Sequence, residues 1–442
     1  ETIPIVSRSN KWVVDEVTVE NNDGGLINSA VVKRNKIVEE RLGVKIENTL
    51  VDGNNYAISD LIRNQAQTDH LYDIFVNSVY STIMYTAENH FANLKELQYL
   101  DLSRPYWSQG FNEAASIGDK QYFVTGAASL STYRFIFVTF FNSDMFKTIP
   151  EIPSLYDTVN AHQWTIDYQM EIASKFWKDM DDNPLTSEGD ICGLVSNANE
   201  ISVDPYWSAR NVRILERDEN GDYTFDNFDA QKLQNVAEKV LQLFYGHGNA
   251  SYDYKHYGND AEQDDIRNMF AAGNAAMATL RIMALESAVM RDMKDEYGVV
   301  PMPKYDEAQK DYGTLLHDQF TVLSIPKTAL DDRRDRISAV MEALCYTSYN
   351  IVRPAYYDVA LRSKLVSDPA EMLDLLFSKV YIDAGVIYTG PLSGFHDQFR
   401  QLMGQKSNRV MSTYQKKARS TRSALQKNIV QKLQKLYDSG NA

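Results

Sequence analysis

The sequence contains few cysteines, few chain-breaking residues and no long apolar run. Its cysteines, Cys192 and Cys345, are too few for a disulfide framework and are not spaced as metal ligands. We therefore expect two small buried side chains. The 21 Gly and 12 Pro make up about 7% of the 442 residues, below the ~12% average, which favours a helix-rich or mixed fold over an all-β one. The longest apolar stretch, Phe135 to Phe141, is strand-length, whereas a membrane span needs about 18 apolar residues.

Positive charge is also in short supply. The chain has 45 Lys and Arg against 60 Asp and Glu, a net charge of −15. This balance disfavours a nucleic-acid partner, because phosphate binding requires concentrated Lys and Arg. The 44% hydrophobic and 24% charged residues are typical of an ordered globular protein, and the length suggests two or three domain-sized units. The start at Glu1, without a signal-type apolar segment, indicates a mature or trimmed chain.

Strands and helices alternate along the first 80 residues, as is typical of an α/β domain. The hydrophobic patterns there predict strands at 11–19, 44–47 and 72–76, and helices at 26–42 and 56–66. Further on they predict strands at 122–124, 135–138, 297–301 and 320–325, helices at 164–178, 229–245 and 262–272, and mainly helix after residue 331. Thr165 is expected to cap the helix at 164–178. Asn220-Gly221 predicts a hairpin turn within 217–222.

The final segment, 406–438, has the pattern of a basic helix. It contains nine basic residues and one acidic residue, so the rest of the chain carries a net charge of −23. Leu425, Ile429, Leu433 and Leu436 form one apolar stripe, which is typical of a helix packed on a protein body. We therefore interpret the segment as a helix packed on the acidic body. A nucleic-acid or membrane contact is the alternative.

Signatures of catalysis and of metal binding are weak. The chain has no H-E-x-x-H, G-x-S-x-G or G-x-G-x-x-G motif. One acidic segment has the spacing of a calcium loop, with possible ligands at Asp179, Asp181, Asn183, Leu185, Ser187 and Asp190. Pro184 stands where such a loop needs glycine for its sharp turn. We therefore expect a solvated acidic loop there, and neither a metal nor a cofactor in the protein.

Aromatic residues are abundant, with 27 Tyr and 5 Trp. Many of them lie beside polar residues, for example in Tyr106-Trp107, Tyr206-Trp207, Tyr356-Tyr357 and at Tyr388. Amphipathic rings can stack on the C–H faces of a sugar while carboxylates and amides bind its hydroxyl groups. The composition therefore favours a polar ligand with apolar faces.

Several segments form an ordered set of motifs. They are Leu26–Ile46, Tyr72–Phe75, Phe141–Phe146 followed by Trp164-Thr165, Phe270–Met277 as F-x-x-G-x-A-A-M, and Tyr297–Lys304 as Y-G-x-x-P-x-P-K. The set covers nearly the whole chain. It resembles the extracellular solute-binding proteins of ABC importers, family 1, and in particular the large lipoproteins of Gram-positive bacteria.

The resemblance implies a particular architecture. We expect an α/β, two-lobed periplasmic-binding-protein-like fold of type II, with hinged lobes and extra C-terminal helices. Residues 1–140 plus 300–350 are expected to form the first lobe, and 141–299 plus 351–442 the second. Ligand is expected in the cleft at the carboxyl ends of the strands, where it would stabilise hinge closure by contacting both lobes.

The resemblance to maltodextrin-type relatives also implies ligand-binding residues. The matching positions are Asn77, Tyr80, Ser129, Tyr133, Asp204, Tyr206, Trp207, Arg281, Asp318 and Tyr356. Asn77 stands where an aromatic residue is frequent, and Met283 where a stacking Trp is common, so the identity of the sugar stays open. Adjacent residues of a strand face opposite sides. One ring of Tyr206-Trp207 is therefore expected in the cleft, with Tyr206 favoured.

The implied function is that of a binding protein without enzymatic activity. It would be a monomer that captures a carbohydrate, expected to be an oligosaccharide, and delivers it to the membrane permease subunits of an ABC transporter. It would be extracellular and anchored to the cell membrane as a lipoprotein. A receptor for peptides or polyamines is one alternative, because Asp204 and Asp318 could pair with a cation. A secreted glycoside hydrolase is the other.

Overall fold

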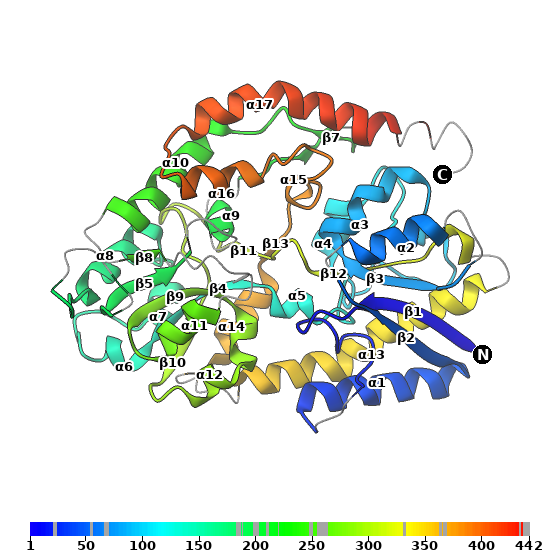
Figure 1. Cartoon of the computed structure of the whole chain (residues 1–442), viewed down its shortest axis with the longest axis horizontal. Coiled ribbons are helices and arrows are strands. Elements are labelled where there is room, and N and C mark those ends of the chain that lie inside the picture. Colours follow the sequence, from blue (N-terminus) through cyan, green and yellow to red (C-terminus); the bar gives the residue numbers. More distant parts are fainter. Residues whose placement is uncertain are drawn as a thin grey trace.

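The computed structural model describes most of the chain. The described residues are 1–20, 24–53, 56–65, 70–182, 187, 189–197, 203–208, 212–219, 221–246, 251–253, 264–329, 333–361, 365, 369–432 and 435. They form two main β-sheets, each flanked by helices, which lie side by side (Figure 1). None of the described helices is long and apolar enough to span a bilayer.

The first sheet has four strands in the order β12-β3-β1-β2. Its strands are β1 (Thr2–Arg8), β2 (Lys45–Val51), β3 (Ile74–Ser78) and β12 (Thr321–Ser324). β1 runs parallel to β2 and β3, and β12 is antiparallel to β3. Helices α1 (Leu26–Leu42) and α13 (Arg334–Leu361) pack against each other beside this sheet, and α2 (Ala57–Gln65) lies between β2 and β3 in the chain.

The second sheet has five strands in the order β10-β4-β9-β5-β8. Its strands are β4 (Phe137–Asn142), β5 (Cys192–Ser196), β8 (Ser251–Asp253), β9 (Ala275–Arg281) and β10 (Tyr297–Val300). Every residue of β4, β5 and β9 is buried, as expected for central strands covered on both faces. The main helices around it are α8 (Ile166–Phe176), α10 (Ala230–Leu241), α11 (Asp264–Ala271), α12 (Ala288–Asp292) and α14 (Pro369–Ser378).

The chain crosses between the two sheets more than once. It leaves the first sheet after β3, builds the second, and returns to the first at β12. A short helix, α5 (Ser131–Arg134), and a two-stranded ladder of β11 (Thr314–Leu315) and β13 (Val380–Tyr381) lie between the two lobes (Figure 1). The molecule therefore has the two-lobed α/β architecture predicted from the sequence. The residue boundaries of the lobes stay a prediction.

Local signals in the sequence predicted most elements correctly. The helix at Leu26–Leu42 has the predicted bounds, and Gly43 ends it in the left-handed conformation with φ of 64°. The Thr165 side chain accepts a hydrogen bond from the backbone N–H of Tyr168, so it caps α8 as predicted. The two cysteines are buried and unpaired, as expected.

Two predicted strands are wrong. The first strand lies at Thr2–Arg8, and the apolar stretch that follows forms turns in which Val13 and Val17 are buried. At 122–124 the backbone makes only a single bridge, from Val124 to Leu323. In both places the residues are of types common in strands, but their side chains fill the core while the backbone makes no strand. Such residue types are favoured wherever their side chains pack well, so they do not by themselves identify a strand.

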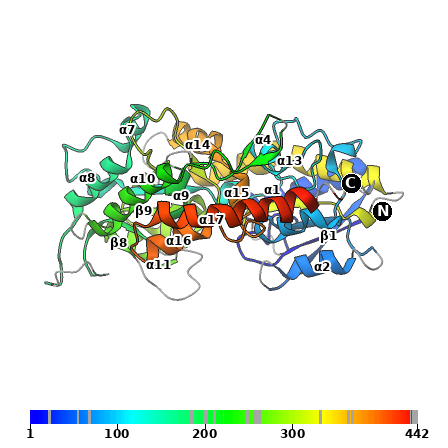
Figure 2. The same cartoon turned by 90° about the horizontal axis from the view of Figure 1, so that it is seen from above.

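The C-terminal helices pack on the second lobe. α16 (Asp397–Gly404) is followed by α17 (Val410–Ala424) and a π-helical turn, Leu425–Val430. α17 packs on α10 and runs towards the first lobe (Figures 1 and 2). Leu425 and Ile429 are buried, which confirms the packed-helix interpretation for this part. Leu433 and Leu436 lie outside the described residues.

A small hairpin bridges the two lobes. It consists of β6 (Glu216–Arg217) and β7 (Tyr223–Thr224), and its turn contains Gly221 with φ of 81°. The Arg217 guanidinium donates to the backbone carbonyls of Glu113 (2.8 Å) and Ser116, at the C-terminal end of α4 (Gln109–Ala115). The Tyr223 hydroxyl also donates to the Ser116 carbonyl, at 3.1 Å. The predicted hairpin is confirmed, although Asn220 of its turn lies outside the described residues, and it ties the second lobe to the first.

The acidic loop near residue 180 brings three carboxylates together. Possible ligand atoms of Asp179, Asp181 and Asp190 lie within 4.8 Å of one another. Asp190 is buried and accepts from the backbone N–H groups of Met180 (2.9 Å) and Ser187 (2.8 Å). Its carboxylate thus organises the loop backbone. Asn183, Pro184 and Leu185, on which the sequence argument partly relied, lie outside the described residues.

Candidate ligand-binding cleft

The carboxyl ends of strands from both sheets face the same region between the lobes. The parallel strands β1 and β3 end at Arg8 and Ser78, and β5 and β9 end at Ser196 and Arg281. Open α/β sheets bind ligands beyond the carboxyl ends of their strands. Six polar side chains gather near these ends and define the candidate site, which we call the cleft cluster: Asp204, Arg281, His317, Asp318, His396 and Arg400.

An arginine and two carboxylates form the centre of the cleft cluster. The Nε of Arg400 lies 2.9 Å from each carboxylate oxygen of Asp204, and its Nη2 also contacts Asp204 Oδ2. The same Nη2 lies 3.6 Å from Oδ2 of Asp318. Both aspartates are buried. Arg400 comes from α16, Asp204 from α9 (Asp204–Ser208) and Asp318 from the loop before β12, so three distant segments meet here.

Two histidines and a second arginine extend the cluster. His317 Nε2 lies 3.3 Å from Asp318 Oδ1, and its Nδ1 lies 3.4 Å from Nη1 of Arg281. His396 Nε2 lies 3.8 Å from Asp204 Oδ1. Both ring nitrogens of buried His396 have no hydrogen-bond partner among the described residues. Such groups are free to bond to a ligand or to water.

Burial and charge pairing set the protonation of these groups. Burial raises the pKa of Asp204 and of Asp318 above the ordinary aspartate value, while Arg400 opposes that rise. Burial and then Arg281 lower the pKa of His317, and burial and then Arg400 lower the pKa of His396 to about 4. Both histidines are therefore neutral at pH 7. Two arginines balance two carboxylates, so the cluster has no large net charge.

Residues of the first lobe complete the cleft. Arg8 donates from Nη2 to the Gln319 carbonyl and to the Thr321 hydroxyl, each at 3.0 Å. Asn77 donates to the Ser81 hydroxyl at 3.2 Å, and its own Oδ1 has no partner among the described residues. Tyr80 lies in the short helix α3 (Val79–Thr82), which directly follows β3, and its side chain is half-buried. A hydrogen bond with Tyr56, together with burial and the nearby Asp397 and Asp318, raises the pKa of Tyr80.

The segment with Tyr206 and Trp207 differs from its prediction. It forms helix α9 rather than a strand, so the expected alternation of faces does not apply. Both rings are fully buried. The Tyr206 hydroxyl donates to Gln169 at 3.1 Å, and the Trp207 indole N–H donates to the Val212 carbonyl at 2.7 Å. Neither ring is open to a ligand in this conformation. Trp207 instead packs against His396, with ring centroids 5.0 Å apart.

Three further predicted residues lie away from the cleft cluster. Tyr133 and Tyr356 contact each other with ring centroids 5.7 Å apart, and both pack on Phe377. Ser129 is buried beside Glu16 and Arg34, next to the first sheet. The structure thus divides the predicted residues among the cleft cluster, the interior of the second lobe, an aromatic group beside α13 and, for Ser129, the interior of the first lobe.

Sequence reasoning missed Arg400 and His396. They lie four residues apart, and therefore on one face of α16 and its preceding turn. The spacing of four residues between His396 and Arg400 was the one feature of the sequence that could have indicated this part of the site. It is weak, because the partner carboxylate of Arg400 lies 196 residues away.

The buried His396 makes stability depend on pH. Its folded-state pKa of about 4 lies below the unfolded value of about 6.5, so its contribution is complete above pH 6.5 and is lost as the pH falls towards 4. This difference between the two pKa values corresponds to about 3 kcal/mol in the free energy of unfolding. We expect His396→Gln to lose less stability than the wild type over this range, measured by urea unfolding at several pH values. The other titrating groups of the cluster are the same in both proteins. Parallel pH profiles would show that His396 is not held neutral.

The fold defined by these two lobes also occurs in solved structures. No protein-family model matches the chain, and no curated protein matches its sequence. An ABC substrate-binding protein from Listeria monocytogenes, in complex with cycloalternan, is 13% identical, with 96% of this chain and 99% of that chain covered and a TM-score of 0.60. The sugar-binding protein MalE from Xanthomonas citri is 11% identical, with 97% and 98% covered and a TM-score of 0.61.

A third similar structure is the GacH receptor of Streptomyces glaucescens, described unliganded and with acarbose. It is 14% identical, with 96% and 98% covered and a TM-score of 0.56. At these identities the likeness shows the fold, and it does so over nearly the full length of each chain. The protein has the two-lobed, periplasmic-binding-protein-like α/β fold.

Proposed function

We propose that the protein captures a neutral carbohydrate, an oligosaccharide, in the cleft between its lobes, as the substrate-binding component of an ABC importer. The observation that carries the proposal is the cleft cluster, in which buried polar groups from β9, α9, α16 and the loop before β12 converge. The similar structures support it, because each is described as a sugar-binding or ABC substrate-binding protein or as a receptor in complex with acarbose.

The charge balance of the cluster favours a neutral ligand. Asp204 is paired through both oxygens with Arg400, and Asp318 lies beside the same guanidinium. A polyamine would need a carboxylate that is not already neutralised, because its ammonium groups must leave water to bind. Sugar hydroxyls instead both donate and accept, so they can bond to the carboxylates, the guanidinium and the neutral imidazoles together.

The same pairing disfavours the hydrolase alternative. A retaining or inverting glycosidase needs one carboxyl that donates a proton and one free carboxylate. In this cluster both aspartates lie beside the same guanidinium, that of Arg400, so neither is a free carboxylate. We therefore propose binding without catalysis.

Ligand contacts from both lobes would stabilise the closed arrangement by a population shift. We propose that Asn77 and Tyr80 supply contacts from the first lobe, and Asp204, Arg281 and Asp318 those from the second lobe and the connecting loop. The predicted lobe boundaries, the extracellular location, the lipid anchor, the monomeric state and the permease partners belong to the same proposal.

Titration calorimetry with a ligand panel tests the function. The panel contains maltotetraose, a cyclic α-glucan, sucrose, a tripeptide and spermidine. We expect saturable binding of at least one carbohydrate, at about micromolar Kd or −8 kcal/mol, and a higher melting temperature in its presence. Asp318→Asn should weaken this binding, whereas Asp335→Asn, on a distant helix start, should not. Binding of only the tripeptide or spermidine, or turnover of any glycan on prolonged incubation, would refute the proposal.

A further inference from the structure

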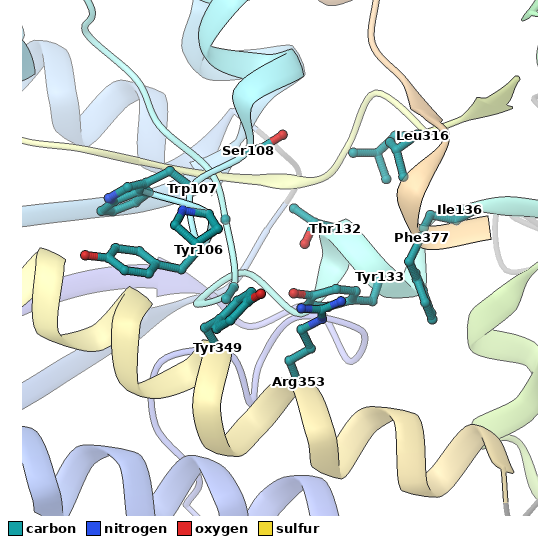
Figure 3. Close-up of a pocket in the computed structure, with 14 residues that line it drawn as sticks. Tyr106, Trp107, Ser108, Thr132, Tyr133, Ile136, Leu316, Tyr349, Arg353 and Phe377 are labelled. Atoms are coloured by element: carbon teal, nitrogen blue, oxygen red, sulfur yellow. The ribbon is translucent and has the colours of Figure 1, made fainter. Parts of the chain in front are cut away.

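A cavity separate from the cleft cluster lies at the lobe junction, beside α13. Its volume is about 310 Å³. Aromatic side chains and one cation dominate its wall, namely Tyr106, Trp107, Tyr133, Tyr349, Arg353 and Phe377. Figure 3 shows these side chains around the cavity, with α13 forming its floor. No member of the cleft cluster lines it, and α13 and α16 lie on opposite sides of the molecule in Figure 1.

The walls of this cavity are held in place by contacts outside it. Glu342 of α13 accepts a hydrogen bond from the Tyr106 hydroxyl and another from the Trp107 indole N–H, the latter at 3.0 Å. The rings of Tyr106 and Tyr349 pack edge to face with centroids 6.4 Å apart. These rings are therefore oriented before any ligand arrives, which lowers the entropic cost of binding.

The cavity wall comes from both lobes. Tyr106 and Trp107 pack with the core of the first lobe, and Phe377 belongs to α14, which packs against β10 of the second sheet. Tyr133 lies on α5 between them and meets Phe377 with ring centroids 5.5 Å apart. A molecule in the cavity would thus touch both lobes.

Arg353 gives the cavity a charge preference. Its guanidinium lies 4.9 Å from the ring centroid of Tyr349 and 5.6 Å from that of Tyr357. It points towards Tyr133 in the cavity (Figure 3). Among the described residues, no carboxylate forms an ion pair with it. A planar cation flanked by rings and without a protein anion is suited to bind a carboxylate.

We propose that this cavity is a second ligand site, which binds a small aromatic carboxylate. The carboxylate would pair with Arg353, and the ring would stack among Tyr133, Tyr349 and Phe377. The volume is about twice that of the ~150 Å³ apolar cavity known to hold one benzene molecule, so a ring with a short acidic side chain fits. Ser108 and Thr132 line the same cavity.

Ligand-observed NMR and calorimetry on the full chain test this site with defined probes. The probes are 4-hydroxyphenylacetate and indole-3-acetate, each compared with its neutral amide. We expect saturable binding of at least one carboxylate and at least about tenfold weaker binding of its amide, because a hydrogen-bonded charge pair is lost. Arg353→Gln should remove this preference, and Arg353→Lys should keep part of it. Arg419→Gln, an exposed change on α17, serves as the matched control.

The outcomes separate this site from the cleft. A carbohydrate bound in the cleft should not compete with the carboxylate for the same residues, so both should bind together. Absence of saturable carboxylate binding at millimolar concentration would overturn the proposal. So would binding that Arg353→Gln leaves unchanged while circular dichroism shows the variant to be folded, or full competition by the cleft carbohydrate.

Discussion

Arg400→Met is expected to lower the free energy of unfolding by about 3–5 kcal/mol and to abolish carbohydrate binding. Arg400 is the cation that neutralises Asp204 and lies 3.6 Å from Asp318, and both carboxylates are buried. Removing one partner of a buried ion pair leaves an uncompensated charge, which is the source of this cost. Binding is lost as well, because the two carboxylates no longer have a fixed position and charge.

A double-mutant cycle measures this coupling. Asp204→Asn alone should also destabilise the protein, and adding it to Arg400→Met should recover part of the loss, since the isolated charge is gone. The matched control is the exposed pair of Arg422 and Asp226, with 3.2 Å between Nε and Oδ1. Its removal should change stability by at most about 1 kcal/mol. Additive effects at Asp204 and Arg400 would contradict a coupled pair.

Trp207→Ala is expected to cost about 3–5 kcal/mol of stability, as for other large buried rings. The ring is completely enclosed and contacts Phe399, Tyr414 and His396. Tyr206→Ala should behave similarly, because its ring is equally buried and its hydroxyl bonds to Gln169. The carbohydrate Kd should change mainly in the Trp207 variant, through His396.

Urea unfolding and carbohydrate titration of the same variants check these expectations. Tyr99→Ala is the control, since this ring is 49% exposed and its removal should have little effect on stability. If Tyr206→Ala keeps wild-type stability but loses affinity, Tyr206 reaches the cleft in a conformation other than the one described here. Tyr206 would then be the stacking ring, as the motif match predicts.

Much of the fold could be predicted from the sequence, because the patterns that define these helices lie within the helices themselves. The helix at Leu26–Leu42 combines apolar spacing with a terminal glycine, and Thr165 caps α8 with its own side chain. The strand expected at 11–19 failed for the opposite reason. Its valines resemble those of a strand, but they fill the core from turns, and no pattern within the segment distinguishes the two uses.

Only part of the candidate site could be predicted from the sequence. Motif matching found Asp204, Arg281 and Asp318, which the structure brings together. It did not find Arg400, because contact with a residue 196 positions away follows from the packing of α16 on α9 and not from local pattern. Nor did it anticipate that Asp204 begins a helix, which turns both neighbouring rings into the lobe.

The basic C-terminal helix gives the molecule a pronounced electric asymmetry. Its cations, among them Lys416, Arg419 and Lys427, are exposed on a body whose remaining residues sum to a net charge of −23. The neutral sugar proposed as ligand would experience almost no force in such a field, so its capture would proceed at the rate of ordinary diffusion and be insensitive to ionic strength. A charged macromolecule, by contrast, is turned by the field as it approaches, and meets the protein in a preferred orientation before any contact forms.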